Sequence, residues 1–214
     1  MTDLPKAPEG TAADLIAAGL RLFGRKGFAA TSIREIAAEA GANVAAIAYH
    51  FGNKEGLRRA CGSEVVRRVG GAFAAVPADP PDSPDAALAR MEATLRAMAG
   101  LVLTAPEAEP ILPFMLRELA EEGPVLDAVY VALMEPMHRR LSALWAAATG
   151  QEAESERTRL LVFTLAGQLL YFRIGRPIVT RRMGWAALGP AEAAVIADVL
   201  ASNLRCLVER ERRT

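Results

Sequence analysis

Cysteine and aromatic residues are scarce in this chain of 214 residues. It has two cysteines, Cys61 and Cys206, and aromatic residues make up 6% of the sequence. Two distant cysteines form neither a disulfide framework nor the paired spacing of a zinc site, which indicates a reducing, cytoplasmic setting. Alanine, leucine and valine supply much of the 52% hydrophobic fraction. Together with many arginines and glutamates, these residues favour helices.

The chain also lacks net charge and long apolar runs. Lys and Arg number 25 and Asp and Glu number 25, so the formal charge is zero. The longest apolar stretch, Leu160–Phe172, is bounded by Arg159 and Arg173. It is shorter than the ~20 residues that a helix needs to cross a bilayer. The first ten residues hold no apolar run and therefore do not form a signal peptide. We expect a soluble protein with no membrane contact.

The zero net charge conceals an uneven distribution. Residues 1–68 hold 10 basic and 7 acidic side chains, and the remainder hold 15 basic and 18 acidic ones. A basic end on an acidic body favours contact between the N-terminal part and a polyanion. Metal binding is not expected: Glu135 and His138 have a helical ligand spacing, but the only other histidine is His50 and no second pair exists. The sequence predicts no cofactor.

Apolar periodicity and capping residues predict an all-α chain, because no stretch alternates apolar and polar residues as a strand does. Residues 1–10 are expected to form a flexible arm. Prolines at residues 77–84 mark a linker, and Pro136 is expected to kink the helix that contains it. About nine helices are expected, at residues 11–26, 32–40, 44–50, 53–76, 84–104, 110–123, 124–149, 154–174 and 190–214, with a short connection at 176–184.

The second and third of these helices have the pattern of a helix-turn-helix. Ser32 and Glu35 form a capping box that opens the second helix, and Asn43 caps the third. Ala37 is small enough for two helices to touch, and Gly41 suits the tight turn between them. The pattern also needs inward-facing apolar residues, which are Ile36, Ala40, Ala42 and Ile47. An ordinary helical hairpin is the alternative, but the combination favours an N-terminal three-helix DNA-binding domain.

The stretch FGRKGFAATSIREIAAEAGANVAAIAYHFGNKEGL at residues 23–57 resembles the signature of the TetR family of bacterial transcriptional regulators. The segment GQLLYFRIGRPIVTRRMGW at residues 167–185 resembles the C-terminal domain of the CecR-like branch, and Asn43–Ile47 fits that branch as well. The resemblance implies a DNA-binding domain at residues 11–57 and a helical ligand-binding and dimerisation bundle at 58–214. The chain departs from the family pattern at Ala48, which is often tyrosine, and at His50, where a Tyr-Phe pair is frequent.

The resemblance implies that the third helix reads DNA in the major groove. Most of its side chains are valine or alanine, which contact thymine methyl groups but cannot hydrogen-bond base edges. Part of the specificity is therefore expected from DNA shape or bridging water. By the same resemblance Lys54 binds a phosphate, whereas Arg58 and Arg59 are expected to be surface charges. The expected DNA-binding residues are Ser32, Arg34, Asn43, Val44, Ala45, Ala46, Tyr49, His50 and Lys54.

The last two long helices have more apolar surface than one face can hold. A helix without a polar face must be covered on two sides. A four-helix contact between two copies of the chain would cover both helices, and a monomer that buries them internally is the alternative. The expected interface residues are Leu160, Phe163, Gly167, Val199, Leu200, Asn203 and Leu207.

The middle helices combine methionine-rich apolar stretches with a few polar residues. Apolar walls with a few polar groups are typical of a small-molecule pocket, although core packing is the alternative for each residue. Gln168 interrupts an apolar helix, and a buried amide needs hydrogen-bond partners. The expected effector-pocket residues are Phe114, Met115, Arg117, His138, Gln168 and Tyr171.

These observations predict a ligand-responsive transcriptional regulator. We expect a repressor that binds a palindromic operator as a homodimer and is released by a small, largely apolar effector. An architectural DNA-binding protein without a ligand is the alternative. An all-helical enzyme is a weaker one, because the sequence has no Ser/His/Asp set, glycine-rich phosphate loop or metal cluster.

Overall fold

The computed structural model describes residues 7–74, 76–77 and 79–213, and over these residues every regular element is a helix. This confirms the all-α class. The described residues form two compact units, one containing the chain up to Gly71 and Glu107–Met134, the other containing Ala72–Pro106 and the chain from Glu135 onward. Residues 1–6 of the predicted N-terminal arm lie outside the described residues.

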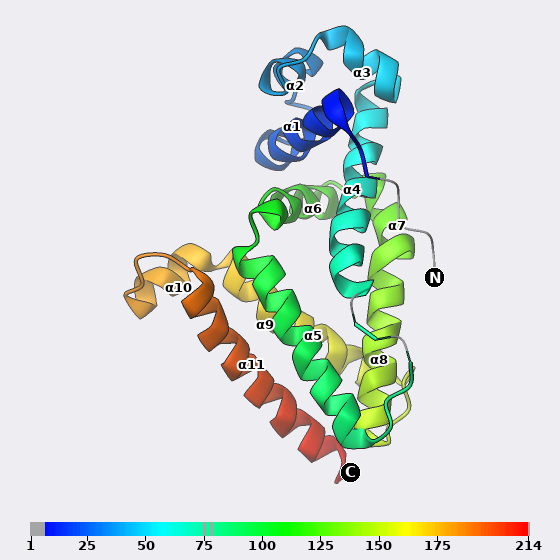
Figure 1. Cartoon of the computed structure of the whole chain (residues 1–214), viewed down its shortest axis with the longest axis vertical. Coiled ribbons are helices and arrows are strands. Elements are labelled where there is room, and N and C mark those ends of the chain that lie inside the picture. Colours follow the sequence, from blue (N-terminus) through cyan, green and yellow to red (C-terminus); the bar gives the residue numbers. More distant parts are fainter. Residues whose placement is uncertain (1–6, 75, 78, 214) are drawn as a thin grey trace. The chain divides into compact units, whose positions relative to one another are not determined.

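The first unit contains the helix-turn-helix and a segment from the middle of the chain. Its helix α6 runs beside α1 (Figure 1). Its elements are α1 (Gly10–Lys26), α2 (Ile33–Glu39), α3 (Val44–Phe51), most of α4 (Lys54–Ala74), α6 (Ile111–Ala120), α7 (Val125–Val129) and the π-helical turn η2 (Tyr130–Met134), with the 3₁₀ turn η1 (Pro106–Ala108) where the segment begins.

The core of the first unit explains why residues 107–134 belong to it. Phe114 of α6 is fully buried, and its ring centroid lies 6.4 Å from that of Phe23 in α1. A side chain at Gly24 would come within 2.9 Å of the Phe114 backbone nitrogen, so glycine permits this close packing. Val125 of α7 joins the same buried cluster. The first unit therefore contains residues 107–134 in addition to the helix-turn-helix.

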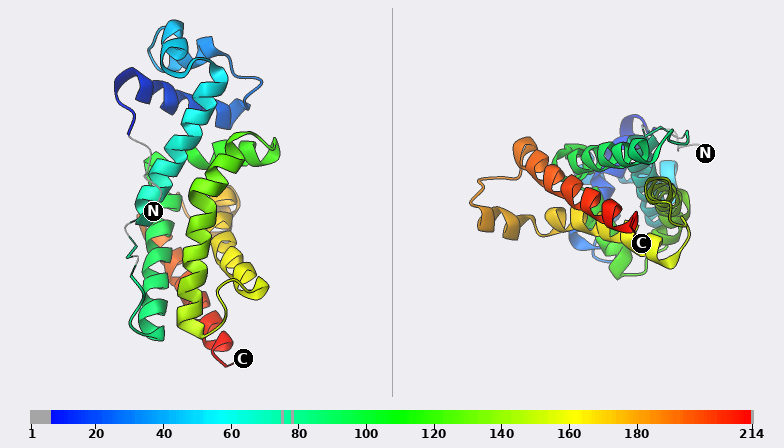
Figure 2. Two further views of the ribbon diagram at one scale, coloured as in Figure 1. Left: turned by 90° about the vertical axis from the view of Figure 1, so that its right-hand side faces the viewer. Right: turned by 90° about the horizontal axis from the view of Figure 1, so that it is seen from below.

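The second unit is a bundle of helices from the middle and the end of the chain. In it α11 runs along α5, and α8 and α9 pack against the same pair (Figures 1 and 2). One buried cluster surrounds Trp145, and a second surrounds Leu103 and Leu169. Its elements are α5 (Pro84–Thr104), α8 (Glu135–Thr149), α9 (Glu156–Ile174), α10 (Arg176–Met183) and α11 (Pro190–Glu211).

Local chemistry sets many of the helix ends. The Ser32–Glu35 capping box is present, and the Asn43 side chain accepts a hydrogen bond from the backbone N–H of Ala45 at 3.0 Å. Gly27, at the end of α1, has a φ of +82°, and Gly41, in the turn before α3, has a φ of +64°. Side chains are disfavoured at positive φ, so glycine is the residue that these two turns require.

Several helices differ from the prediction in their bounds or continuity. The helix α1 begins at Gly10, one residue early, with no side-chain cap. The predicted helix at 124–149 is interrupted by the π-helical turn Tyr130–Met134. Pro136 lies just beyond this turn and cannot donate a backbone hydrogen bond to residue 132, which accounts for a shifted hydrogen-bond pattern there. The helix α6 ends at Ala120 rather than at Gly123.

Candidate functional site

The helix-turn-helix presents one side of α3 to solvent. Ile36 and Ala37 of α2 and Ile47 of α3 are buried in the core that α1 completes. These contacts fix α3 from its inner side. Its outer side carries Ala45, Ala48 and Tyr49, all exposed.

The structure brings the predicted DNA-binding residues together in the first unit. They surround the outer side of α3 and the start of α4. Six are exposed, namely Ser32, Arg34, Asn43, Ala45, Tyr49 and His50, and three are half-buried, namely Val44, Ala46 and Lys54.

Two of these polar side chains are engaged in helix caps. The Ser32 hydroxyl donates to Glu35 Oε2 at 2.9 Å and accepts from the Glu35 backbone N–H at 3.2 Å. The side-chain oxygen of Asn43 accepts a hydrogen bond from the backbone N–H of Ala45, and the side-chain NH₂ group of Asn43 takes no part in this cap. Ser32 therefore stabilises the start of α2 with the same groups that would read a base.

Tyr49 is the most exposed aromatic side chain of this site, with 85% of its surface accessible. Its ring meets the His50 ring edge-on, with the centroids 4.9 Å apart. A large ring that packs so little against its own protein is available to contact a partner.

The cations of α1 are paired with carboxylates of α2. Arg21 Nε lies 2.6 Å from Glu39 Oε1, and Lys26 Nζ lies 2.6 Å from Glu35 Oε1. Hydrogen bonds from Lys26 and from the Ser32 backbone lower the pKa of Glu35 to about 2. These pairs join α1 to α2, so the positive charge of α1 is largely neutralised within the unit.

Lys54, at the start of α4, is different. Its Nζ lies 4.3 Å from the centroid of the Phe28 ring, and no ion pair joins it to a carboxylate among the described residues. Partial burial, and then the charge of Arg58, lower the pKa of Lys54. The backbone N–H groups of the first turn of α4 lie nearby, and Asn53 caps one of them, that of Gly56, at 2.8 Å. A helix N-terminus with an unpaired ammonium beside it suits an anion.

Arg58, which was expected to be a surface charge, is in fact buried and only 6% exposed. Its Nε donates to Glu118 Oε1 of α6 at 2.7 Å, and its terminal nitrogen lies 3.4 Å from Glu121 Oε2. Gly123 has no side chain, and a Cβ there would lie 2.2 Å from the Glu118 carboxylate. No local pattern of residues indicates this ion pair, because its partners are far apart along the chain.

The predicted effector-pocket residues divide between the two units. In the first unit, Phe114 belongs to the core, Met115 packs against that core, and the exposed Arg117 donates to the Arg25 carbonyl at 3.4 Å. Phe114 is thus explained by core packing.

The other three residues lie in the second unit. The amide oxygen of Gln168 accepts from Asn203 Nδ2 of α11 at 2.9 Å, so this amide joins two helices. His138 Nε2 lies 3.1 Å from the Arg159 carbonyl, and its ring stacks near Phe163. Tyr171 is exposed. Gln168 and His138 thus each have a polar partner within the second unit.

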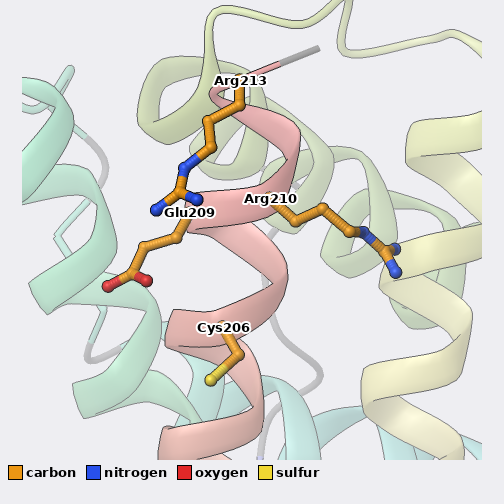
Figure 3. A pocket seen from close by; sticks show the side chains of 4 residues that line it. All are labelled: Cys206, Glu209, Arg210 and Arg213. Atoms are coloured by element: carbon orange, nitrogen blue, oxygen red, sulfur yellow. The ribbon is translucent and has the colours of Figure 1, made fainter.

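One surface depression lies on the second half of α11. Figure 3 shows its four lining side chains: Cys206, Glu209 and Arg210 come from α11, and Arg213 follows just after the end of that helix. A small-molecule site usually encloses its ligand with walls from several elements. The depression is too open to fit that description.

The predicted dimer-interface residues lie on α9 and α11. Leu160 and Phe163 are each 57% exposed and Val199 is 53% exposed. Leu200 differs from the prediction because it is 3% exposed and packs in the core of its own unit with Ile196. The remaining predicted residues are Gly167 and Asn203, which are exposed, and Leu207, which is half-buried. Exposed residues that the prediction omitted are Val195, Leu170 and Ile174, whose helical spacing from Val199 and Phe163 indicates the same face.

Two further properties concern the described part of the chain. None of its helices is both long and apolar enough to cross a membrane. Its His, Cys, Asp and Glu side chains do not gather into a group of three or more that could hold a metal ion.

Two protein-family models match the chain. Residues 15–61 match the bacterial regulatory proteins of the tetR family. Residues 87–209 match the C-terminal domain of the HTH-type transcriptional dual regulator CecR. The first match covers the helix-turn-helix, and the second runs from α5 into α11 and includes residues 107–134 of the first unit.

Individual relatives agree with these matches. The CecR regulator of Shigella flexneri is 34% identical over 204 residues, which is 91% of this chain and 90% of that protein. A TetR-like regulator from Rhodococcus is 19% identical, with a TM-score of 0.65 over 94% of this chain and 97% of that one. The structure of AibR with isovaleryl coenzyme A and operator DNA is 18% identical, with a TM-score of 0.65 over 90% of this chain and 96% of that one.

The helix-turn-helix, the two family matches and the relatives agree on one function. The matched families consist of DNA-binding transcriptional regulators and not of enzymes. The chain belongs to the TetR family of bacterial transcriptional regulators, in the CecR branch.

Proposed function

We propose that this regulator is a repressor that acts in the cytoplasm, binds a palindromic operator as a homodimer and leaves it when a small effector binds. The observation that carries the proposal is the outer side of α3, whose residues are exposed while its inner side is fixed by buried contacts. Two such helices, one from each protomer, would enter successive major grooves about 34–36 Å apart.

The DNA contact is proposed to combine a few direct interactions with recognition of DNA shape. Arg34, the Asn43 NH₂ group and Tyr49 are the groups of this face that can reach bases, whereas Lys54 and His50 suit phosphates. Ala45 and Ala48 offer only methyl groups. Sequence preference should therefore depend on deformable or narrow-groove steps as well as on base edges.

The dimer is supported by the apolar surface on α9 and α11. The exposed side chains of Leu160, Phe163 and Val199 lie on helices that the Gln168–Asn203 hydrogen bond holds side by side. A Cβ at Gly167 would have no neighbour within 4 Å, so another helix can approach closely there. Exposed apolar side chains of this kind mark an interaction site, and a second copy of the chain would cover them symmetrically.

The effector is proposed to be a small, largely apolar molecule with one or two hydrogen-bonding groups. The related AibR was solved with isovaleryl coenzyme A and operator DNA, which makes a ligand-responsive mechanism reasonable for this chain. Release follows if the effector prefers a conformation in which the recognition helices no longer match the groove spacing.

The test begins with selection of an operator from a random duplex library, followed by gel-shift titration and footprinting. We expect a palindromic site with two half-sites. Y49A should weaken DNA binding. Y130A is the control: it removes another exposed tyrosine, in η2, and should bind DNA like the parent. Failure to enrich any sequence, or equal binding by both variants, would contradict the proposed recognition surface.

Sedimentation tests the assembly. We expect a dimer at micromolar concentration, and V199E should yield monomers because it places a charge in the apolar face. V131E changes a comparably exposed valine of η2 and serves as the control. A monomeric parent would refute the dimer. Repression is tested with a promoter fusion, where deletion of the regulator should raise reporter expression.

A further inference from the structure

Phe28 lies in the loop between α1 and α2 and contacts two cations of α4. Its half-buried ring packs on Phe23, with the centroids 5.5 Å apart. Lys54 Nζ lies 4.3 Å from the Phe28 centroid, and the guanidinium carbon of Arg58 lies 4.4 Å from it. Both distances are within the range at which the ring's negative face attracts a cation.

The two cations differ in their other partners. Arg58 is held by Glu118 and Glu121 and is buried, so its charge is already compensated. Lys54 has no ion pair with a carboxylate in the part of the chain that the structure describes. Burial and the neighbouring Arg58 lower the pKa of Lys54, against weaker opposing effects of Glu35 and Glu55. An added anion would therefore stabilise the charged form of Lys54.

The Phe28 ring restrains the Lys54 side chain. A lysine ammonium sits on a flexible four-carbon stem and loses rotamer entropy when a partner fixes it. An aromatic face restrains the ammonium without accepting its hydrogen bonds, so its N–H groups remain available to an oxygen. Phe28 is itself restrained, because Phe23 packs on it and Arg58 lies over it.

We propose that Phe28 is a positioning residue for the DNA-phosphate contact of Lys54. Its ring holds the ammonium beside the N-terminus of α4, where the phosphate oxygen binds, before DNA arrives. This inference rests on the proposed DNA contact of Lys54 and adds the residue that prepares it.

The test measures binding to a short, fluorescein-labelled duplex of mixed sequence by anisotropy over a range of salt concentrations. Such binding depends on phosphate contacts, and each lost contact reduces the slope of log K against log salt by about 0.9. K54A should lose this amount per protomer. F28L should weaken binding about two- to five-fold, the range of an exposed cation–π contact, and should reduce the slope in part. F28Y keeps the ring and should bind like the parent.

A double-mutant cycle separates positioning from a general structural effect. F28L/K54A should bind no more weakly than K54A alone, because the ring then has no ammonium to position. F73L is the matched control: Phe73 lies in the second unit under Arg140, at 5.2 Å, and its loss should leave the salt slope unchanged. Thermal unfolding checks that each variant is folded, and F28M replaces F28L if the latter does not fold.

The outcomes are distinct. A parent that does not bind any duplex would overturn the proposed DNA contact itself. A parent that binds with K54A unchanged would overturn only the lysine contact and its positioning. Additive effects of F28L and K54A, or a parental salt slope in F28L beside a reduced slope in K54A, would refute the role of Phe28.

Discussion

Removal of Arg58 tests the buried ion pair of the first unit. In R58A the Glu118 carboxylate would stay buried without its cation, since the side chain of Glu118 is 2% exposed. Its second oxygen already has no hydrogen-bond partner among the described residues. The cost of leaving a buried charge unpaired is about 3–5 kcal/mol. In a chain of this size that lowers the melting temperature by roughly 6–20 °C.

The assay is thermal and urea unfolding at neutral pH, with two comparison variants. R67A removes an arginine that is 31% exposed and leaves Glu64 paired with Arg68, so its cost should stay below about 1 kcal/mol. R58M/E118L replaces both buried charges with apolar groups and should be close to the parent or more stable. A loss below about 1 kcal/mol in R58A would refute the reasoning, because it would mean that water reaches the Glu118 carboxylate.

Three other predictions concern local features of the first unit and both thiols. The pKa of Glu35 is lowered from 4.5 to about 2, so its ionised form contributes fully to the free energy of unfolding above pH 4.5, and this contribution is lost as the pH falls toward 2. The difference in stability between the parent and E35Q should therefore be present at pH 7 and shrink as the pH approaches 2 in unfolding curves. Cys61 is buried, which raises the pKa of its thiol, whereas Cys206 is exposed. A thiol reagent should therefore label Cys206 and leave Cys61 unmodified until the protein unfolds. Rapid labelling of both cysteines in the folded protein would contradict this. G41A forces a side chain to a φ of +64° and should lower the free energy of unfolding by about 1 kcal/mol in denaturant titration. G71A is the control, because a side chain there has open space within α4, and it should be neutral or stabilising. An equal loss of stability in both variants would contradict the argument from backbone conformation.

The sequence determined the features that depend on neighbours along the chain. Ser32 with Glu35 marked the start of α2, Asn43 marked the start of α3, and Gly41 marked the turn between them, because caps and turns are formed within a few residues. The buried Ile47 followed from helical periodicity in the same way. These signals were sufficient to predict the helix-turn-helix and the exposed outer side of α3.

The tertiary structure decided which distant surfaces meet. Helical periodicity predicts that a face is apolar but not which element covers it. For Phe114 both interpretations, a pocket residue and a core residue, therefore stayed open until its packing on Phe23 was known. Arg58 read as surface charge because its partner, Glu118, lies 60 residues away. The strength of such a pair depends on exclusion of water by the surrounding fold, and no local pattern of residues carries that information.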